Sequence, residues 1–141
     1  MKPIISSFMF FDDSQHIPNS GAPGMSMHLI NPQNTIKTPF IPSSFSFAVA
    51  FGIVSIDTEQ SHVLSFQLID PEGNFVVDTS EIQLNAEPGN NDNIPIEARG
   101  YNFNLNLRNV QLQYKGKYTG RVTVDHEIIG EFPLFVYPVN N

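Results

Sequence analysis

The sequence predicts an all-β domain built from two antiparallel sheets packed face to face. Helix-forming residues are sparse along the 141 residues, whereas Phe, Val, Ile, Asn, Pro and Gly are plentiful. Branched and aromatic side chains favour a pleated, half-buried surface, and Gly, Pro and Asn favour turns. Apolar and polar residues also alternate repeatedly along short segments, and no segment shows convincing helical periodicity. At this length, one domain with a hydrophobic core is expected.

Residues 1–40 are the least regular part of the chain. Residues 2–11 are predicted to form a first strand, and residues 26–30 a second strand. Proline-containing segments at 18–21 and 39–42 predict loops between and after these strands.

Alternation is clearest in segment 45–54. One face of this segment carries the large residues Phe45, Phe47, Val49, Phe51 and Ile53, and the other face carries Ser46, Ala48, Ala50 and Gly52. This pattern predicts a strand whose large side chains enter the core. Its small face would let another layer of the protein come close.

A hairpin is predicted around Pro71 and Gly73. Residues 61–70 alternate as a strand, and residues 75–77 return as its partner. Proline presets the turn between them, and glycine accepts the positive φ that closes it. A short strand at 80–84 and a loop at 85–94 are predicted to follow.

The last part of the chain predicts three strands. In residues 101–107 the odd positions are apolar and the even positions are Asn, as in a sheet with one solvated face. Residues 118–124 and 127–137 form the final pair, joined at Asp125 and His126. Gly130 marks a predicted bulge, and Pro133 predicts a sheet edge or irregularity because it cannot donate a ladder hydrogen bond.

Segment 105–120 resembles part of an immunoglobulin-type domain. Leu105 to Leu112 is similar to strand E of such domains, and Gly116-Lys117-Tyr118 is similar to their tyrosine corner. Residues 118–136 are also similar to the final hairpin of uncharacterised bacterial proteins built on this kind of sandwich. No activity comes with this resemblance.

The resemblance implies an immunoglobulin-like sandwich within a single domain, residues 1–141. Its core would span residues 43–141, and residues 1–40 would add an N-terminal extension of one or two strands. Gly120 stands where antibody domains carry their second cysteine, and Phe66 corresponds best to their core tryptophan. The core is therefore expected to be aromatic and free of disulfides. The Tyr118 hydroxyl is expected to bond to backbone within residues 113–116.

Composition argues against several classes of function. The net charge is −7, and the seven Lys and Arg residues form no cluster, so no nucleic-acid partner and no anionic membrane surface are expected. The absence of cysteine excludes disulfides, zinc–thiolate sites and thiol catalysis. No convincing signal peptide or transmembrane segment occurs, and a cytoplasmic location is expected.

No motif predicts a catalytic or cofactor site. Asp12, Asp13 and His16 offer ligand types suited to a divalent cation, but a solvated loop is the simpler interpretation. The acidic loop 87–92 lacks the alternating carboxylate spacing of calcium loops. The four histidines are scattered, and no glycine-rich phosphate loop or nucleophile motif is present. We expect no enzyme activity, no cofactor and no metal.

The outward row of strand 101–107 is the most suggestive surface. It contains Asn102, Asn104 and Asn106 and is continued by Arg108, and His126 at the last hairpin tip is a further possible contact. The leading hypothesis is a module that binds a protein partner, or another copy of itself. The alternative is a carbohydrate- or ligand-binding sandwich that uses this row or loop 87–92. For the row itself, we favour the interpretation that uncharged amides only keep the face soluble, since sugar sites more often show an exposed Trp or Tyr, which this face lacks.

Overall fold

The computed structural model describes residues 2–18, 24–88 and 94–139. The described chain is all-β apart from one short 3-10 turn, η1 (Ile96–Ala98). The strands are β1 (Ile4–Pro18), β2 (Met25–Gln33), β3 (Thr35–Thr38), β4 (Ser43–Val54), β5 (His62–Ile69), β6 (Phe75–Asp78), β7 (Ile82–Leu84), β8 (Gly100–Leu112), β9 (Gly116–Val124) and β10 (Glu127–Pro138). No helix in this part of the chain is both long and apolar enough to cross a bilayer.

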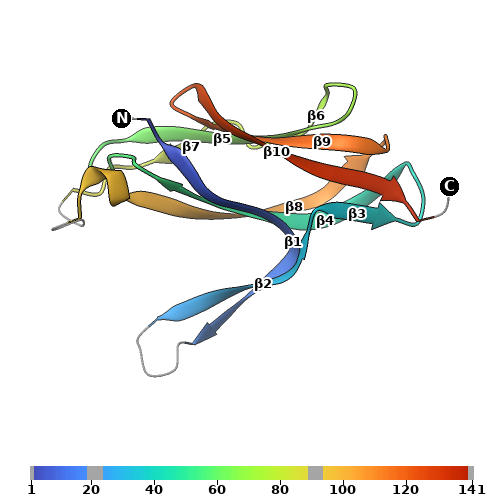
Figure 1. The fold of residues 1–141 in the computed structure, drawn as a ribbon, viewed down its shortest axis with the longest axis horizontal. Helices are drawn as coiled ribbons and strands as arrows, with labels where there is room; N and C mark the ends of the chain where they lie inside the picture. Colours follow the sequence, from blue (N-terminus) through green and yellow to red (C-terminus); the bar gives the residue numbers. More distant parts are fainter. Residues whose placement is uncertain (1, 19–23, 89–93, 140–141) are drawn as a thin grey trace.

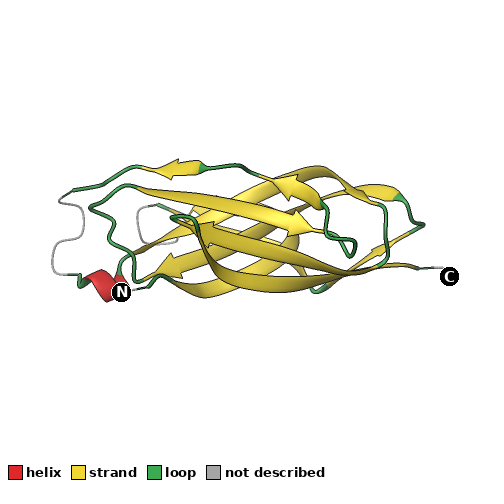
Figure 2. Ribbon diagram, turned by 90° about the horizontal axis from the view of Figure 1, so that it is seen from above, coloured by secondary structure: helices red, strands yellow, loops and turns green. Residues whose placement is uncertain are grey.

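The strands form two sheets that lie as two layers (Figure 1). The four-stranded sheet has the order β2-β1-β4-β8, and the six-stranded sheet has the order β3-β10-β9-β5-β6, with β7 also paired to β5. Most strands run along the long axis of the molecule (Figure 2). The predicted all-β, two-sheet class is confirmed.

The core lies between the two sheets. Its side chains are those that the alternation predicts, such as Val49 and Phe51 from β4 and Phe66 and Leu68 from β5, and each is at most 2% exposed. Alternate residues of the central strands therefore bury apolar surface, which is the main term that stabilises the fold.

Turn chemistry follows the predictions. Gly73 has φ +87° in the turn between β5 and β6, and the N–H of Gly73 donates to the carbonyl of Asp70. Asp125 and His126 both have positive φ at the tip between β9 and β10. The register shifts between Ile128 and Gly130, so the predicted bulge is present.

Strand β3 departs from the purely antiparallel arrangement that the sequence predicts. It pairs in parallel with β10, with Thr35 opposite Phe135. The sequence does not predict β3 because four residues of mixed polarity are too short a segment to show a clear alternation. It does not predict the parallel pairing because the partner strand is distant in the sequence. Pro133 pairs with Thr119 of β9 and lies outside the register with β3, so its missing N–H faces an unpaired edge.

Strands β1 and β2 are longer than predicted. Residues 4–11 of β1 pair with β4, so β1 is an integral strand of the sheet, whereas residues 10–18 pair with β2. We call the hairpin of residues 12–18 and 25–31 the arm; it leaves the two layers and lies below the sheet formed by β4 and β8 (Figure 1). Phe11, at the base of the arm, is fully buried but is not part of the core between the sheets.

Phenylalanine rings surround Gly120, the position where the resemblance to antibody domains would place a cysteine. A Cβ atom on Gly120 would lie 3.0 Å from Phe10, 3.3 Å from Phe66 and 3.3 Å from Phe8. Phe8 also stacks on Phe132, with ring centroids 4.0 Å apart. The glycine thus makes room for aromatic rings, and apolar burial holds this part of the core.

Tyr118 makes the hydrogen bond that the tyrosine-corner pattern predicts. Its ring is fully buried, and its hydroxyl donates to the carbonyl of Tyr114 over 2.8 Å. Burial raises the pKa of Tyr118 above its ordinary value, and the nearby charge of Asp70 adds to this, although the bond to Tyr114 opposes them.

We expect Tyr118→Phe to lower the free energy of unfolding by about 1 kcal/mol, because the Tyr114 carbonyl loses its donor. Urea denaturation followed by circular dichroism measures this change. Tyr137→Phe is the matched control, since Tyr137 is exposed on β10. Equal stability of the two variants would show that the corner bond contributes nothing.

Candidate functional site

The predicted asparagine row lies on the outer face of the four-stranded sheet. Strand β8 is at the edge of this sheet and pairs with β4, so that Asn102 lies opposite Gly52, Asn104 opposite Ala50, and Asn106 opposite Ala48. Paired residues in an antiparallel ladder point to the same face. The amides therefore stand beside a row of small residues.

The arm folds back under this face and leaves a wedge-shaped hollow. We call this space the wedge; its volume is about 540 Å3. Its lining residues are Ser7, His16, Met27, Leu29, Ala50, Phe51, Asn102, Phe103 and Asn104. Hollows of this size accommodate a small ligand or a few residues of another chain.

Register explains which arm residues face the wedge. Ser14 pairs with Leu29 and His16 with Met27, so these four side chains share one face of the arm. Ile30 pairs with Asp13, which is one residue before Ser14 in the strand. The side chains of Ile30 and Asp13 therefore lie on the opposite face of the arm. The wedge thus has an amide-bearing floor and a wall that combines apolar and polar groups.

Asn104 ties the floor to the arm. Its Nδ2 donates to Ser14 Oγ over 3.2 Å and lies 3.2 Å from Met27 Sδ. Its Oδ1 is buried and has no hydrogen-bond partner among the described residues. A buried acceptor without a donor costs free energy, and a ligand that donated a hydrogen bond to Asn104 would remove this cost.

The predicted site residues do not all meet. Asn106 and Arg108 line a second hollow of about 200 Å3 together with Asp12 and Asp13, on the same face of the sheet. His126 lies at the β9–β10 tip, 3.6 Å from Glu81, and does not line the wedge. The asparagine row and Arg108 form one surface, and His126 is not part of it.

The acidic residues of the arm are engaged in local hydrogen bonds. Asp12 accepts hydrogen bonds from Asn31 (2.6 Å) and Gln33, and Asp13 accepts one from the N–H of Ser14. Within the described ranges, no three His, Asp or Glu side chains gather as a metal site. The predicted loop 87–92 falls largely outside the described residues.

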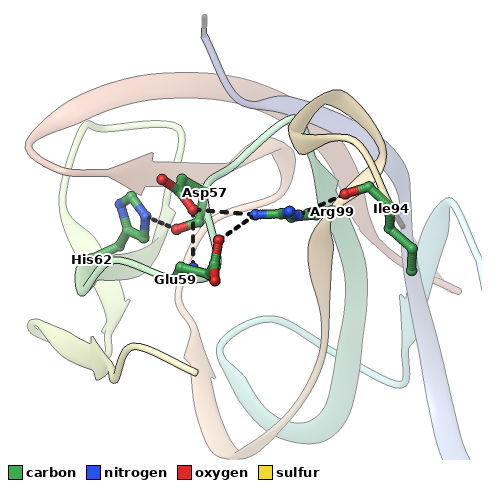
Figure 3. Close-up of polar contacts among 5 residues, drawn as sticks. All are labelled: Asp57, Glu59, His62, Ile94 and Arg99. Atoms are coloured by element: carbon green, nitrogen blue, oxygen red, sulfur yellow. Dashed lines mark hydrogen bonds and ion pairs between the residues drawn. The ribbon is translucent and has the colours of Figure 1, made fainter. Parts of the chain in front are cut away.

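A second polar cluster lies at one end of the layers, in the β4–β5 connection and its neighbours (Figure 3). Arg99 places Nη1 2.9 Å from Glu59 and 3.7 Å from Asp57, and its Nε donates to the carbonyl of Ile94 over 2.9 Å. His62 Nε2 lies 2.7 Å from the carbonyl of Asp57. These contacts join the β4–β5 connection to the start of β8.

His62 has an acceptor beside each ring nitrogen, an arrangement that favours its protonated form. Nδ1 lies 2.7 Å from the carboxylate of Asp125, and Nε2 faces the carbonyl of Asp57. Burial alone lowers the pKa of His62, but the hydrogen bonds and the charges of Asp125 and Asp57 outweigh it and raise the pKa. Likewise, burial raises the pKa of Asp125, but hydrogen bonds from His62 and Val63 lower it overall.

This pair predicts a pH-dependent contribution to stability. Because the pKa of His62 is raised in the fold, the contribution is fully present below its ordinary value of 6.5 and is lost as the pH rises through the folded value. Because the pKa of Asp125 is lowered, its part is lost as the pH falls below 3.8. The stability difference between wild type and His62→Gln should therefore be larger at about pH 5.5 than at about pH 8.5.

Urea denaturation at both pH values measures this difference. The matched control is His28→Gln, because His28 is exposed on the arm. A difference that is flat, or that grows with pH, would contradict the charged pair.

Sequence reasoning missed the arm side of the wedge. No local pattern indicates that residues 14, 16, 27 and 29 face the asparagine row, since the contact depends on how a hairpin folds back. The pairing of His62 with Asp125, which lie 63 residues apart, carries no local signal either.

Comparison with solved structures finds only low similarity. This chain is similar to the alkylpurine DNA glycosylase AlkC of Pseudomonas fluorescens bound to DNA containing an abasic site analog, at 12% identity and a TM-score of 0.43, covering 74% of this chain and 28% of that one. It is also similar to a β-glucosidase from Listeria innocua, at 13% identity and a TM-score of 0.41, covering 74% of this chain and 15% of that one. A β-glucosidase from Listeria innocua in complex with isofagomine is similar at 12% identity and a TM-score of 0.41. The match covers 93% of this chain and 16% of that one.

The chain spans less than a third of each of these proteins, and the likenesses carry no argument about fold or activity. No curated protein matches the sequence. A family model does match, over residues 27–137, which is most of the chain. The chain therefore belongs to the family described as "Family of unknown function (DUF6941)".

Proposed function

We propose that this chain is a non-enzymatic binding module that engages a protein partner in the wedge. The wedge itself is the observation that carries the proposal. It is a hollow of about 540 Å3 between a sheet face and an arm, and a buried acceptor of Asn104 lies within its lining. Recognition sites combine apolar contact with a few polar groups that fix orientation, as this lining does.

The arm adds contact area beside the wedge. Ile17 and Ile30 are 41% and 37% exposed on its outer face, and Met27 is 40% exposed on its inner face. Exposed large apolar residues grouped on one projecting hairpin favour burial against another protein. A second copy of this chain is one such protein.

The proposed module is an immunoglobulin-like sandwich. In support, β1, β4 and β8 neighbour one another in one sheet, and β10, β9 and β5 in the other. This matches the order of strands A, B and E and of strands G, F and C in immunoglobulin domains. The corner bond of Tyr118 supports the same assignment.

The proposal of a non-enzymatic role is supported by the state of the titratable groups. His62 has both ring nitrogens engaged, and Arg99 lies between carboxylates and a carbonyl. Neither group is placed to exchange a proton with a substrate. A screen of hydrolase substrates that gave turnover would overturn this part of the proposal.

Filling the wedge tests the proposed function. Ala50 stands on the wedge floor, and Ala86 is exposed in the loop after β7. We expect Ala50→Phe to weaken partner binding about tenfold or more, because a large side chain occupies the contact centre, and we expect Ala86→Phe to leave it unchanged.

Two measurements cover the two kinds of partner. Light scattering after size-exclusion chromatography, over a range of concentrations, detects self-association, and capture from an extract of the source organism detects another protein. A protein that stays monomeric and captures no partner would contradict the proposal. Equal capture by wild type and by Ala50→Phe would contradict it as well.

Carbohydrate binding is the second candidate function, because the side-chain amides of Asn102 and Asn104 line the wedge. A glycan array probed with calcium and with a chelator tests it. Binding that is lost in Ala50→Phe would support a sugar site in the wedge. If no glycan binds either with calcium or with the chelator, carbohydrate binding is excluded as a function of the wedge.

A further inference from the structure

We infer that the wedge recognises the main chain of an extended polypeptide segment that lies along β8. This inference rests on the proposed function and names the form in which the partner is held. It concerns Asn102 and Asn104, which line the wedge, and Asn106, which continues the same face of β8 beyond the wedge; together they form a ladder of side-chain amides.

The spacing of the ladder matches an extended chain. Alternate residues of a strand are separated by about 6.7 Å, because each residue advances the strand by about 3.3 Å. An extended segment presents an N–H and a C=O to the same side with this same period. Each asparagine amide offers both a donor and an acceptor, which are the two groups that such a segment needs.

The floor beside the ladder lets a main chain come close. Of the residues of β4 opposite the three asparagines, Gly52 and Ala48 are buried. Ala50, opposite Asn104, is partly exposed and lines the wedge with no side-chain atom beyond Cβ. Small side chains permit close approach of another backbone, as glycine does where ligands contact a main chain.

Asn104 has a hydrogen-bonding deficit that a peptide group would remove. Its Nδ2 lies 3.2 Å from the Met27 thioether, which is a weak acceptor, and its buried Oδ1 lacks a donor among the described residues. A peptide carbonyl would replace the thioether as acceptor, and a peptide N–H would supply the missing donor. Met27 is flexible and partly exposed, so it can move aside and pack against a side chain of the segment.

The charge and shape of the lining favour a main chain over other ligands. Among the described lining residues, His16 alone has a titratable side chain, so a neutral ligand fits. Stacking of a sugar ring needs an exposed aromatic face. Of the aromatic residues in the described lining, Phe51 is 2% exposed within the core, and Phe103 is partly buried and packs against the core. Leu29 and Met27 instead offer apolar contact to alternate side chains of a strand.

Capped, uncharged pentapeptides test this inference. The probes are acetyl-Thr-X-Thr-X-Thr-amide with X as Ala, Val, Leu or Phe, titrated into 15N-labelled protein and followed by NMR. We expect chemical-shift changes at the wedge lining with at least one peptide. Methylation of the backbone nitrogens of both X residues should weaken that peptide about tenfold or more, because the donors are lost while the side chains remain.

Variants place the contact on the ladder. Asn104→Ala should weaken the peptide about tenfold, and Asn85→Ala should not, because Asn85 is exposed in the loop after β7. Folding of each variant is verified from its NMR spectrum. Equal binding of the methylated peptide, shifts outside the wedge, or no shifts with any of the four peptides would overturn the inference.

Failure of this inference and failure of the proposed function are distinguishable. If Ala50→Phe abolishes partner capture while no peptide binds, the partner uses the wedge in another form. If Ala50→Phe leaves capture intact, the wedge is not the interface. Binding of methyl glycosides in place of peptides would assign the amides to a sugar.

Discussion

Phe66→Ala is expected to lower the free energy of unfolding by about 3–5 kcal/mol, the range observed when a buried aromatic ring is removed. Phe66 is fully buried, and its ring centroid lies 6.3 Å from that of Phe8 and 6.2 Å from that of Phe51. One atom of its ring lies 3.3 Å from the position that a Cβ atom on Gly120 would occupy. Its removal leaves a cavity between the sheets that rigid neighbours cannot fill.

Urea denaturation measures this loss, and Phe75→Ala is the matched control. Phe75 lies on the neighbouring strand β6 and is 54% exposed, so its removal should cost less than about 1 kcal/mol. A small loss for Phe66→Ala would mean that the aromatic cluster is not the centre of the core.

Gly100→Ala is expected to lower the free energy of unfolding by about 3 kcal/mol or more. A Cβ atom on Gly100 would overlap the carbonyl oxygen of Ile53 and lie 2.8 Å from its carbonyl carbon and 3.0 Å from Val54 Cα. These are backbone atoms of β4, which pairs with Gly100 at Val54, so relief requires the two strands to separate locally.

Gly52→Ala is the matched control for Gly100→Ala. A Cβ atom on Gly52 would meet Ser6 Oγ at 2.7 Å and Asn102 Oδ1 at 2.9 Å, which are ends of side chains that can rotate away. Thermal unfolding should give a much smaller loss for this variant. Similar losses for both variants would show that β8 can shift away from β4 at little cost.

Much of the fold could be predicted because it is encoded locally. Strand β5 buries every second residue, and β4 carries a large apolar residue at every second position. A period of two is readable from about ten residues without knowledge of the partner strand. The turn at Gly73 and the bulge at Gly130 are likewise marked by residue type. The Tyr118 bond followed from a resemblance that covers a short, distinctive stretch.

The rest depends on contacts between distant residues. The second half of β1 is polar and ends at Pro18, so its sequence favours a loop, and its pairing with β2 overrides that preference. The asparagine row was predictable as an outward face, but the contact of Asn104 with Met27 of the arm was not. The same local alternation of apolar and polar residues occurs in a fully solvated row and in a row that lines a hollow. Only the position of the arm distinguishes the two cases.

The parallel pair of β3 and β10 has a consequence for biosynthesis. Thr35 pairs with Phe135, a separation of 100 residues, so β3 has no partner until nearly all of this segment has left the ribosome. Ordering so long a connection is slow, and an unpaired strand can meanwhile attach to other nascent chains. Lys37, at the centre of β3, places a charge there, which is a common means of keeping a waiting strand from pairing with the wrong chain.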